Sequence, residues 1–216
     1  MEYMIGRKNP KLQAEIAQKI VVKAFNIILI LAGARVTCVG RENVPTDQAV
    51  LYVANHRDYF DILTGYTTVP TLTSFVSKKE IKKFPCINHW MGFLKCLFLD
   101  RENPKEGIKT ILQGITQIKE GYSIFIMPEG TRNHKDTLLP FHEGSFRLAT
   151  KTGCPIVPVA MKNTDNILSN HFAWIKPTQV KIVYGKPIYL NELPPEDKKF
   201  IGAYSQKIIQ EMLEKL

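Results

Sequence analysis

Residues 49–61 read AVLYVANHRDYFD, a short apolar run that ends at Asn55 in a cluster of polar side chains. A run of this kind is typical of a strand that is buried on both faces of a sheet. More apolar runs follow along the chain, and we expect each to form a strand: residues 72–76, 94–99, 123–127, 155–161 and 179–184.

Helical segments separate several of these runs. Residues 104–121, residues 141–153 and the segment that follows Pro195 are predicted to be helices. In the last of them we expect Phe200 and Ile201 to face the core. Strands that alternate with helices predict an α/β domain with a largely parallel or mixed central sheet flanked by helices.

The beginning of the chain has a different character. Residues 11–34 show apolar side chains at steps of three and four, and residues 24–34 carry no charge. That apolar stretch is shorter than the ~20 residues that a membrane-spanning helix needs. We therefore expect residues 1–34 to form an N-terminal amphipathic helical segment that lies in a membrane interface, followed by an α/β domain over residues 35–216. A core helix or a dimer-packing helix is the alternative.

The composition limits the class of protein. Hydrophobic residues make up 44% and charged residues 23% of the 216 residues, which excludes disordered, collagen-like and coiled-coil chains. The 29 Lys and Arg against 20 Asp and Glu give a net charge of +9. This excess predicts an anionic partner, which is nucleic acid, an acidic membrane face or a phosphorylated ligand. The four cysteines form no CxxC pair, so we expect reduced thiols in a reducing compartment.

The polar cluster after the first strand contains a histidine and nearby carboxylates. A carboxylate that holds an imidazole in one tautomer is the minimum requirement for a general base. His56 and Asp61 are five positions apart, which is about 140° around an ideal helix, so they would not face each other inside one. They can meet only if His56 lies in the loop and Asp61 lies in the first helical turn. Asp58 is the other candidate carboxylate.

Two further polar clusters follow predicted strands, where open α/β sheets form their ligand clefts. Asp100 and Arg101 end one strand, and the second cluster contains Glu129, Gly130 and Arg132. The planar guanidinium of an arginine matches the oxygens of a phosphate, and glycine allows a close approach of the backbone. Each arginine taken alone is better explained by a surface ion pair.

Together, the clusters resemble the glycerolipid acyltransferase family, which has four ordered sequence blocks. The first block, N-H-x-x-x-x-D, is similar to residues 55–61, and the second, ending F-I-D-R, is similar to residues 98–101. The third, F-P-E-G-T-R, resembles residues 127–132, and the fourth, an apolar run around a proline, resembles residues 156–160. The order and spacing agree across roughly half of the chain.

The resemblance implies direct transfer of a fatty acyl group to the sn-2 hydroxyl of lysophosphatidate, which yields phosphatidate. The acyl donor would be a thioester, either acyl-coenzyme A or an acyl carrier protein, so no further cofactor and no metal are expected. His56 would be the general base and Asp61 would orient it. Arg101 and Arg132 would bind the phosphate of the acceptor.

Other residues of the third block would bind substrate as well. Glu129 would position the glycerol hydroxyl or fix an arginine, and Thr131 belongs to the same block. The tetrahedral oxyanion needs hydrogen-bond donors, for which the Gly130 amide and Lys78 are candidates.

The expected partners are a membrane surface with anionic lipids, a lysophospholipid acceptor and, as an alternative donor, an acyl carrier protein. We expect a peripheral or monotopic protein at the cytoplasmic face of a membrane. Lysines and aromatic residues within residues 78–93 would extend the membrane surface.

Three alternatives remain at the level of sequence. In the first alternative, the enzyme acylates another lysophospholipid or another lipid hydroxyl. The second is a non-catalytic protein that binds anionic lipid or nucleic acid. Nucleic acid is not expected, because the basic residues are spread along the chain without a recognition motif. The third is a phosphohydrolase, which needs more metal ligands than the sequence offers near His56.

Asp58 and Lys95 are among the positions that depart from the family pattern. Asp58 stands where the family often has a small polar residue, so that a second carboxylate lies near the base. Lys95 stands where the second block usually has glycine.

Overall fold

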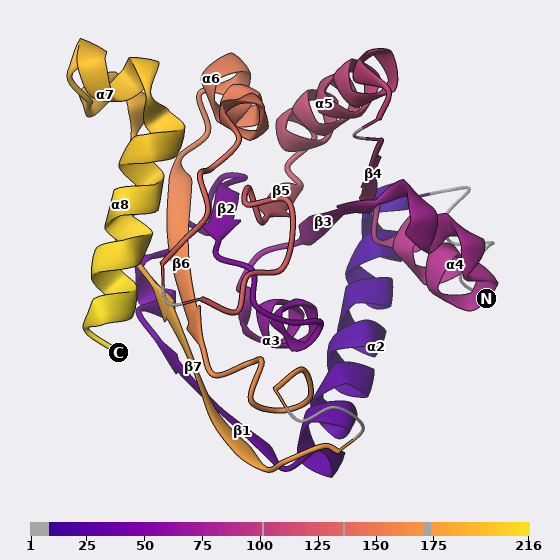
Figure 1. Ribbon diagram of the computed structural model, residues 1–216. Coiled ribbons are helices and arrows are strands. Elements are labelled where there is room, and N and C mark those ends of the chain that lie inside the picture. Colours follow the sequence, from indigo (N-terminus) through magenta and orange to yellow (C-terminus); the bar gives the residue numbers. More distant parts are fainter. Residues whose placement is uncertain (1–8, 101, 136, 171–173) are drawn as a thin grey trace.

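A central seven-stranded sheet organises the protein in the computed structural model, which describes residues 9–100, 102–135, 137–170 and 174–216 (Figure 1). The strands lie in the order β1-β7-β6-β2-β5-β3-β4. Their bounds are β1 Ala34–Val39, β2 Leu51–Ala54, β3 Thr73–Lys78, β4 Leu97–Leu99, β5 Ser123–Ile126, β6 Ile156–Lys162 and β7 Thr178–Tyr184.

All neighbouring strands of this sheet are parallel except β6 and β7, which pair antiparallel. The mixed α/β architecture predicted from the alternating pattern is therefore confirmed. β2 lies between β6 and β5, so the polar cluster that follows β2 emerges near the middle of the sheet.

Helices cover both faces of the sheet (Figure 1). Their bounds are α2 Pro10–Leu31, α3 Phe60–Thr68, α4 Pro85–Phe93, α5 Pro104–Lys119, α6 Arg147–Thr152, α7 Pro195–Lys199 and α8 Ile201–Glu214. Short 3₁₀ turns span Arg41–Asn43, Lys79–Lys83, Glu143–Phe146 and Leu190–Glu192.

The alternation of side chains along β2 divides the core between the two faces. Tyr52 and Ala54 belong to a cluster with residues of α2 and α3, and Leu51 and Val53 belong to a cluster with residues of α5, α6 and α8. Every residue of β2 is buried, as the apolar run predicts for a strand covered on both faces.

Four details differ from the expectation. The first helix ends at Leu31 rather than at position 34, and the next residues form β1, an edge strand that the sequence pattern did not reveal. The strand predicted at 94–99 is only Leu97–Leu99, because Lys95 turns the chain with a φ of 56°. The last helix is broken at Phe200, whose ring is exposed instead of facing the core, whereas Ile201 is buried as predicted.

α2 packs on the body of the protein through its buried Ala14, Ala17, Val21 and Leu29, and contacts α3, α4 and β1. Toward the C-terminal end of α2 the exposed side is largely apolar and includes Ile27, Ile28, Ile30 and Leu31. Within the described residues no helix is both long and apolar enough to cross a membrane.

Candidate functional site

The candidate site is assembled from loops that follow three neighbouring parallel strands. β5 and β6 both pair parallel with β2, so the carboxyl ends of all three strands lie at one edge of the sheet. In open α/β sheets this edge is where ligands bind. The first, third and fourth sequence blocks follow or include these strands, which explains why residues far apart in sequence meet here.

His56 and Asp61 are in contact, in the one arrangement that their spacing allows. His56 lies in the loop after β2, Asp61 lies in the first turn of α3, and the distance from His56 Nδ1 to Asp61 Oδ2 is 2.8 Å. The Asp61 side chain is fully buried and the His56 side chain is 21% exposed. The buried carboxylate can therefore hold one nitrogen of a ring that is still open to solvent.

Asp61 Oδ2 accepts two more hydrogen bonds. The backbone N–H groups of Arg57 and Asp58 donate to it, at 2.6 Å and 2.8 Å. Such backbone donors fix the orientation of the carboxylate. The loop thus wraps around the carboxylate that contacts His56.

Asp58 does not compete for the imidazole. Its Oδ1 accepts from the N–H of Phe60 at the start of α3, at 3.0 Å, and its Oδ2 accepts from the hydroxyl of Ser169. A carboxylate at this place satisfies a free amide at a helix N-terminus. Asp58, the unusual carboxylate of the first block, thus stabilises the loop and the start of α3.

Glu129 is buried and both of its carboxylate oxygens accept hydrogen bonds from the protein. Oε1 accepts from the backbone N–H of His56 at 2.9 Å. Oε2 accepts from the Asn133 side chain at 3.1 Å and from the Leu139 N–H at 3.0 Å. In addition, the Asn133 N–H donates to the His56 carbonyl at 2.7 Å. The first and third blocks are therefore joined directly, through groups on both sides of His56.

The remaining residues of the third block form a turn. Gly130 has a φ of 75°, which glycine adopts without strain, and its N–H donates to the Met127 carbonyl at 3.1 Å. In this structure that N–H is engaged inside the turn. Thr131 and Arg132 are exposed, and the Arg132 guanidinium lies 4.1 Å from the centre of the Tyr59 ring. The turn thus presents a cation beside the loop of residues 55–59 that follows β2 (the His56 loop).

Lys78 and the second block lie further along the sheet. Lys78 ends β3, is exposed, and is in register with Leu99 of β4. β5 lies between β2 and β3, and β4 lies beyond β3, which places β4 roughly 14 Å from β2 at the usual strand spacing. Asp100 forms an ion pair with Lys79 at 3.0 Å. Arg101 lies outside the described residues.

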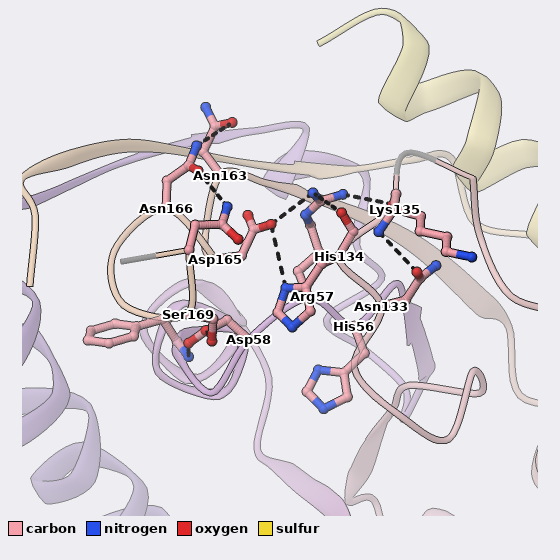
Figure 2. Close-up of polar contacts among 12 residues, drawn as sticks. His56, Arg57, Asp58, Asn133, His134, Lys135, Asn163, Asp165, Asn166 and Ser169 are labelled. Atoms are coloured by element: carbon pink, nitrogen blue, oxygen red, sulfur yellow. Dashed lines mark hydrogen bonds and ion pairs between the residues drawn. The ribbon is translucent and has the colours of Figure 1, made fainter. Parts of the chain in front are cut away.

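Sequence reasoning missed several residues that shape the site. Asn55 bridges β2 and β6, since its side chain donates to the Met161 carbonyl at 2.9 Å and accepts from the Met161 N–H at 2.8 Å. Arg57 forms an ion pair with Asp165 from the loop after β6 (Figure 2). The role of Asn55 could have been predicted, because it is a polar residue at the end of a buried strand. No local sequence pattern predicts the role of Asp165. No group of three potential metal ligands occurs among the described residues.

We expect Glu129→Gln to destabilise the folded protein even without substrate. A glutamine has one oxygen and one NH₂ group, so at least one donor that now faces a carboxylate oxygen would lose its acceptor. A buried unpaired donor costs about 1–3 kcal/mol. Urea unfolding in the absence of lipid measures this loss, and the exposed Glu211→Gln on α8 is the control, with an expected effect of less than about 0.5 kcal/mol. Equal unfolding midpoints for wild type and Glu129→Gln would contradict the bridging role.

Proteins similar in sequence to this chain are named acyltransferases. A protein from Saccharomyces cerevisiae named 1-acyl-sn-glycerol-3-phosphate acyltransferase is 30% identical over 205 residues, which is 93% of this chain and 66% of that protein. A protein of the same name from Borreliella burgdorferi is 32% identical over 142 residues, or 66% of this chain and 57% of that protein. The chain spans from 44% to 66% of the length of such curated relatives.

A solved structure shows the same fold. The crystal structure of the 1-acyl-sn-glycerophosphate (LPA) acyltransferase PlsC from Thermotoga maritima has a TM-score of 0.78 with this chain at 25% identity, and the match covers 97% of this chain and 81% of that one. The sequence model of the Acyltransferase family matches residues 35–162, which include the His56–Asp61 contact and the turn that carries Arg132. The chain therefore belongs to the Acyltransferase family.

Proposed function

We propose that the protein transfers a fatty acyl group from a thioester to the sn-2 hydroxyl of lysophosphatidate and so forms phosphatidate. The observation that carries the proposal is the 2.8 Å contact between His56 and the buried Asp61 at the carboxyl edge of the sheet. The names of the relatives and of the solved neighbour support the same reaction and acceptor.

The chemistry follows from the two side chains. An alcohol is a weak nucleophile near neutral pH, so its proton must be removed as its oxygen attacks the thioester carbonyl. Asp61 engages Nδ1 of the ring, which leaves Nε2 of His56 as the nitrogen that takes this proton. Asp61 then stabilises the imidazolium, and the proton passes to the departing thiolate as the tetrahedral intermediate collapses. The donor is already activated, so no acyl-enzyme is needed.

We propose that Arg132, the exposed arginine of the third block, binds the phosphate of the acceptor. Arg132 lies beside the His56 loop, because the adjacent Asn133 is hydrogen-bonded to the His56 carbonyl. Its guanidinium suits bidentate binding of phosphate oxygens. Arg101, Lys78 and Thr131 remain proposed substrate ligands, and the donor is acyl-coenzyme A or an acyl carrier protein. Mass spectrometry of the products formed from each donor and a panel of lysolipids identifies both substrates, and distinguishes lysophosphatidate from another lipid hydroxyl.

We also propose that the protein works as a peripheral or monotopic protein at the cytoplasmic face of a membrane. Ile30 and Leu31 at the end of α2 are 74% and 81% exposed, and the chain carries a net charge of +9. Apolar side chains on the surface of a basic protein suit an interface with anionic lipids. The 3₁₀ turn Lys79–Lys83 and the exposed Phe84 that follows it would add to this surface.

His56→Ala should abolish the general base and leave the fold intact. We expect the turnover number with lysophosphatidate and a long-chain thioester to fall about 10²–10⁴-fold. Steady-state kinetics and thermal unfolding measure the two effects. His89→Ala, which removes an exposed histidine of α4, is the matched control and should retain wild-type turnover. Near-normal turnover by His56→Ala would exclude the catalytic role.

Arg132→Ala should weaken binding of the acceptor more than it slows the chemical step. Loss of a charge-assisted contact costs roughly 2 kcal/mol, so KM for lysophosphatidate should rise about 30-fold. An acceptor without phosphate, monoacylglycerol, should be affected little. Arg147→Ala on the surface of α6 serves as the control. An unchanged KM for lysophosphatidate would rule out the phosphate contact.

Two glutamates introduced at the end of α2 should reduce membrane binding. The double variant Ile30→Glu/Leu31→Glu removes exposed apolar side chains and adds negative charge, so its partition constant should fall at least about tenfold. Co-sedimentation with phosphatidylglycerol–phosphatidylcholine vesicles measures it. Ile108→Glu/Leu112→Glu changes two exposed apolar residues of α5 in the same way. Equal losses in both double variants would show that the α2 surface has no special role.

A further inference from the structure

Two carboxylates, one from each loop, connect the loop between β6 and β7 to the His56 loop (Figure 2). Asp165 of the β6–β7 loop accepts from the Arg57 guanidinium at 2.8 Å. In the opposite direction, Asp58 of the His56 loop accepts from the hydroxyl of Ser169. Each segment thus supplies one carboxylate and one donor to the other.

The Arg57–Asp165 pair is removed from solvent. The Asp165 side chain is 2% exposed and the Arg57 side chain is 17% exposed. Burial alone would raise the pKa of Asp165, but the hydrogen bond and the positive charge of Arg57 outweigh it, so that the pKa lies below its ordinary value. The pair is therefore ionised, and loss of one partner would leave a buried charge uncompensated.

Arg57 also reaches the loop after β5. Its guanidinium donates to the carbonyls of Lys135 and His134, at 3.2 Å and 3.4 Å (Figure 2). The His134 ring is 3.9 Å from Asp165. One side chain of the His56 loop thus holds together the loops that follow β2, β5 and β6.

These side-chain contacts bear on the reacting histidine through the backbone. The amides of Arg57 and Asp58 are the two that donate to Asp61 Oδ2, the oxygen that contacts His56. An Arg57 side chain anchored at Asp165 and an Asp58 side chain anchored at Ser169 restrict rotation of the backbone that carries these two amides. Fixing both side chains therefore fixes the direction in which Asp61 holds the imidazole.

We propose that Asp165 and Arg57 are positioning residues, whose ion pair keeps the amides of the His56 loop on Asp61 and so keeps the imidazole aligned for proton transfer. The proposal rests on the proposed function. Neither side chain needs to touch substrate for this role, so their loss acts on the chemical step more than on the affinity for the acceptor. A misplacement of about 1 Å at a reacting group costs on the order of 100-fold in rate.

The kinetic test compares Asp165→Asn, Arg57→Gln and the double variant. Each single change should lower kcat about 100-fold and leave KM for lysophosphatidate within about threefold. The double variant removes both charges, so its Tm should recover toward wild type while its kcat stays low. A purely structural ion pair predicts instead that kcat returns together with Tm, and that result would overturn the proposal. So would a single variant that keeps wild-type kcat.

Glu143→Gln is the matched control. Glu143 also joins two segments, since its carboxylate accepts from the N–H groups of Gly202 and Ala203 at the start of α8. This variant should lower Tm without a change in kcat.

A spectroscopic readout separates this proposal from the proposed function. In ¹⁵N-labelled protein, the imidazole resonances of His56 are identified by their absence in His56→Ala. Asp165→Asn should shift them and Glu143→Gln should not, whatever substrate the enzyme uses. Unchanged His56 resonances in Asp165→Asn would overturn the positioning role. Absence of acyl transfer by the wild type, together with the shift, would refute the proposed function alone.

Discussion

Three donors meet at a single carboxylate oxygen, Oδ2 of Asp61, and the arrangement of the site depends on them. Two are backbone amides of the loop after β2 and the third is the His56 ring. The loop has no regular secondary structure, so no helix or strand supplies acceptors for the amides of Arg57 and Asp58. The buried carboxylate gathers these donors and so fixes both the loop and the orientation of the His56 ring.

Further carboxylates support this loop. Glu129 holds the N–H of His56, Asp58 caps α3, and Asp165 holds Arg57. Each is at most 4% exposed and each has donors that match its charge. In a chain with a net charge of +9, these buried acids accept hydrogen bonds from amides, one hydroxyl and one guanidinium. The acids that are buried among the described residues, Asp58, Asp61, Glu129 and Asp165, are thus gathered around the loop that carries His56.

The departures from the family pattern at Asp58 and Lys95 have structural consequences of different kinds. Asp58 adds a cap to α3 and a bond to Ser169, and so becomes part of the support of the loop. Lys95 adopts a φ of 56°, a conformation that glycine takes more readily. The usual glycine of the second block is thus replaced by a residue that keeps the left-handed turn at some cost.

The sequence by itself determined the α/β class, the buried β2 and the order of the four blocks, and it allowed His56 to meet Asp61 only if a helix began between them. All of these depend on local signals, namely apolar runs, turns and a spacing of five residues. Only the tertiary structure decided that β2 lies between β5 and β6, and with it that Glu129 contacts His56 across 73 positions and Asp165 contacts Arg57 across 108. It also decided that β1 forms a sheet edge and that the last helix breaks at Phe200. A local pattern reports which side of a segment is buried, but the neighbour that buries it is chosen by packing among segments distant in the chain.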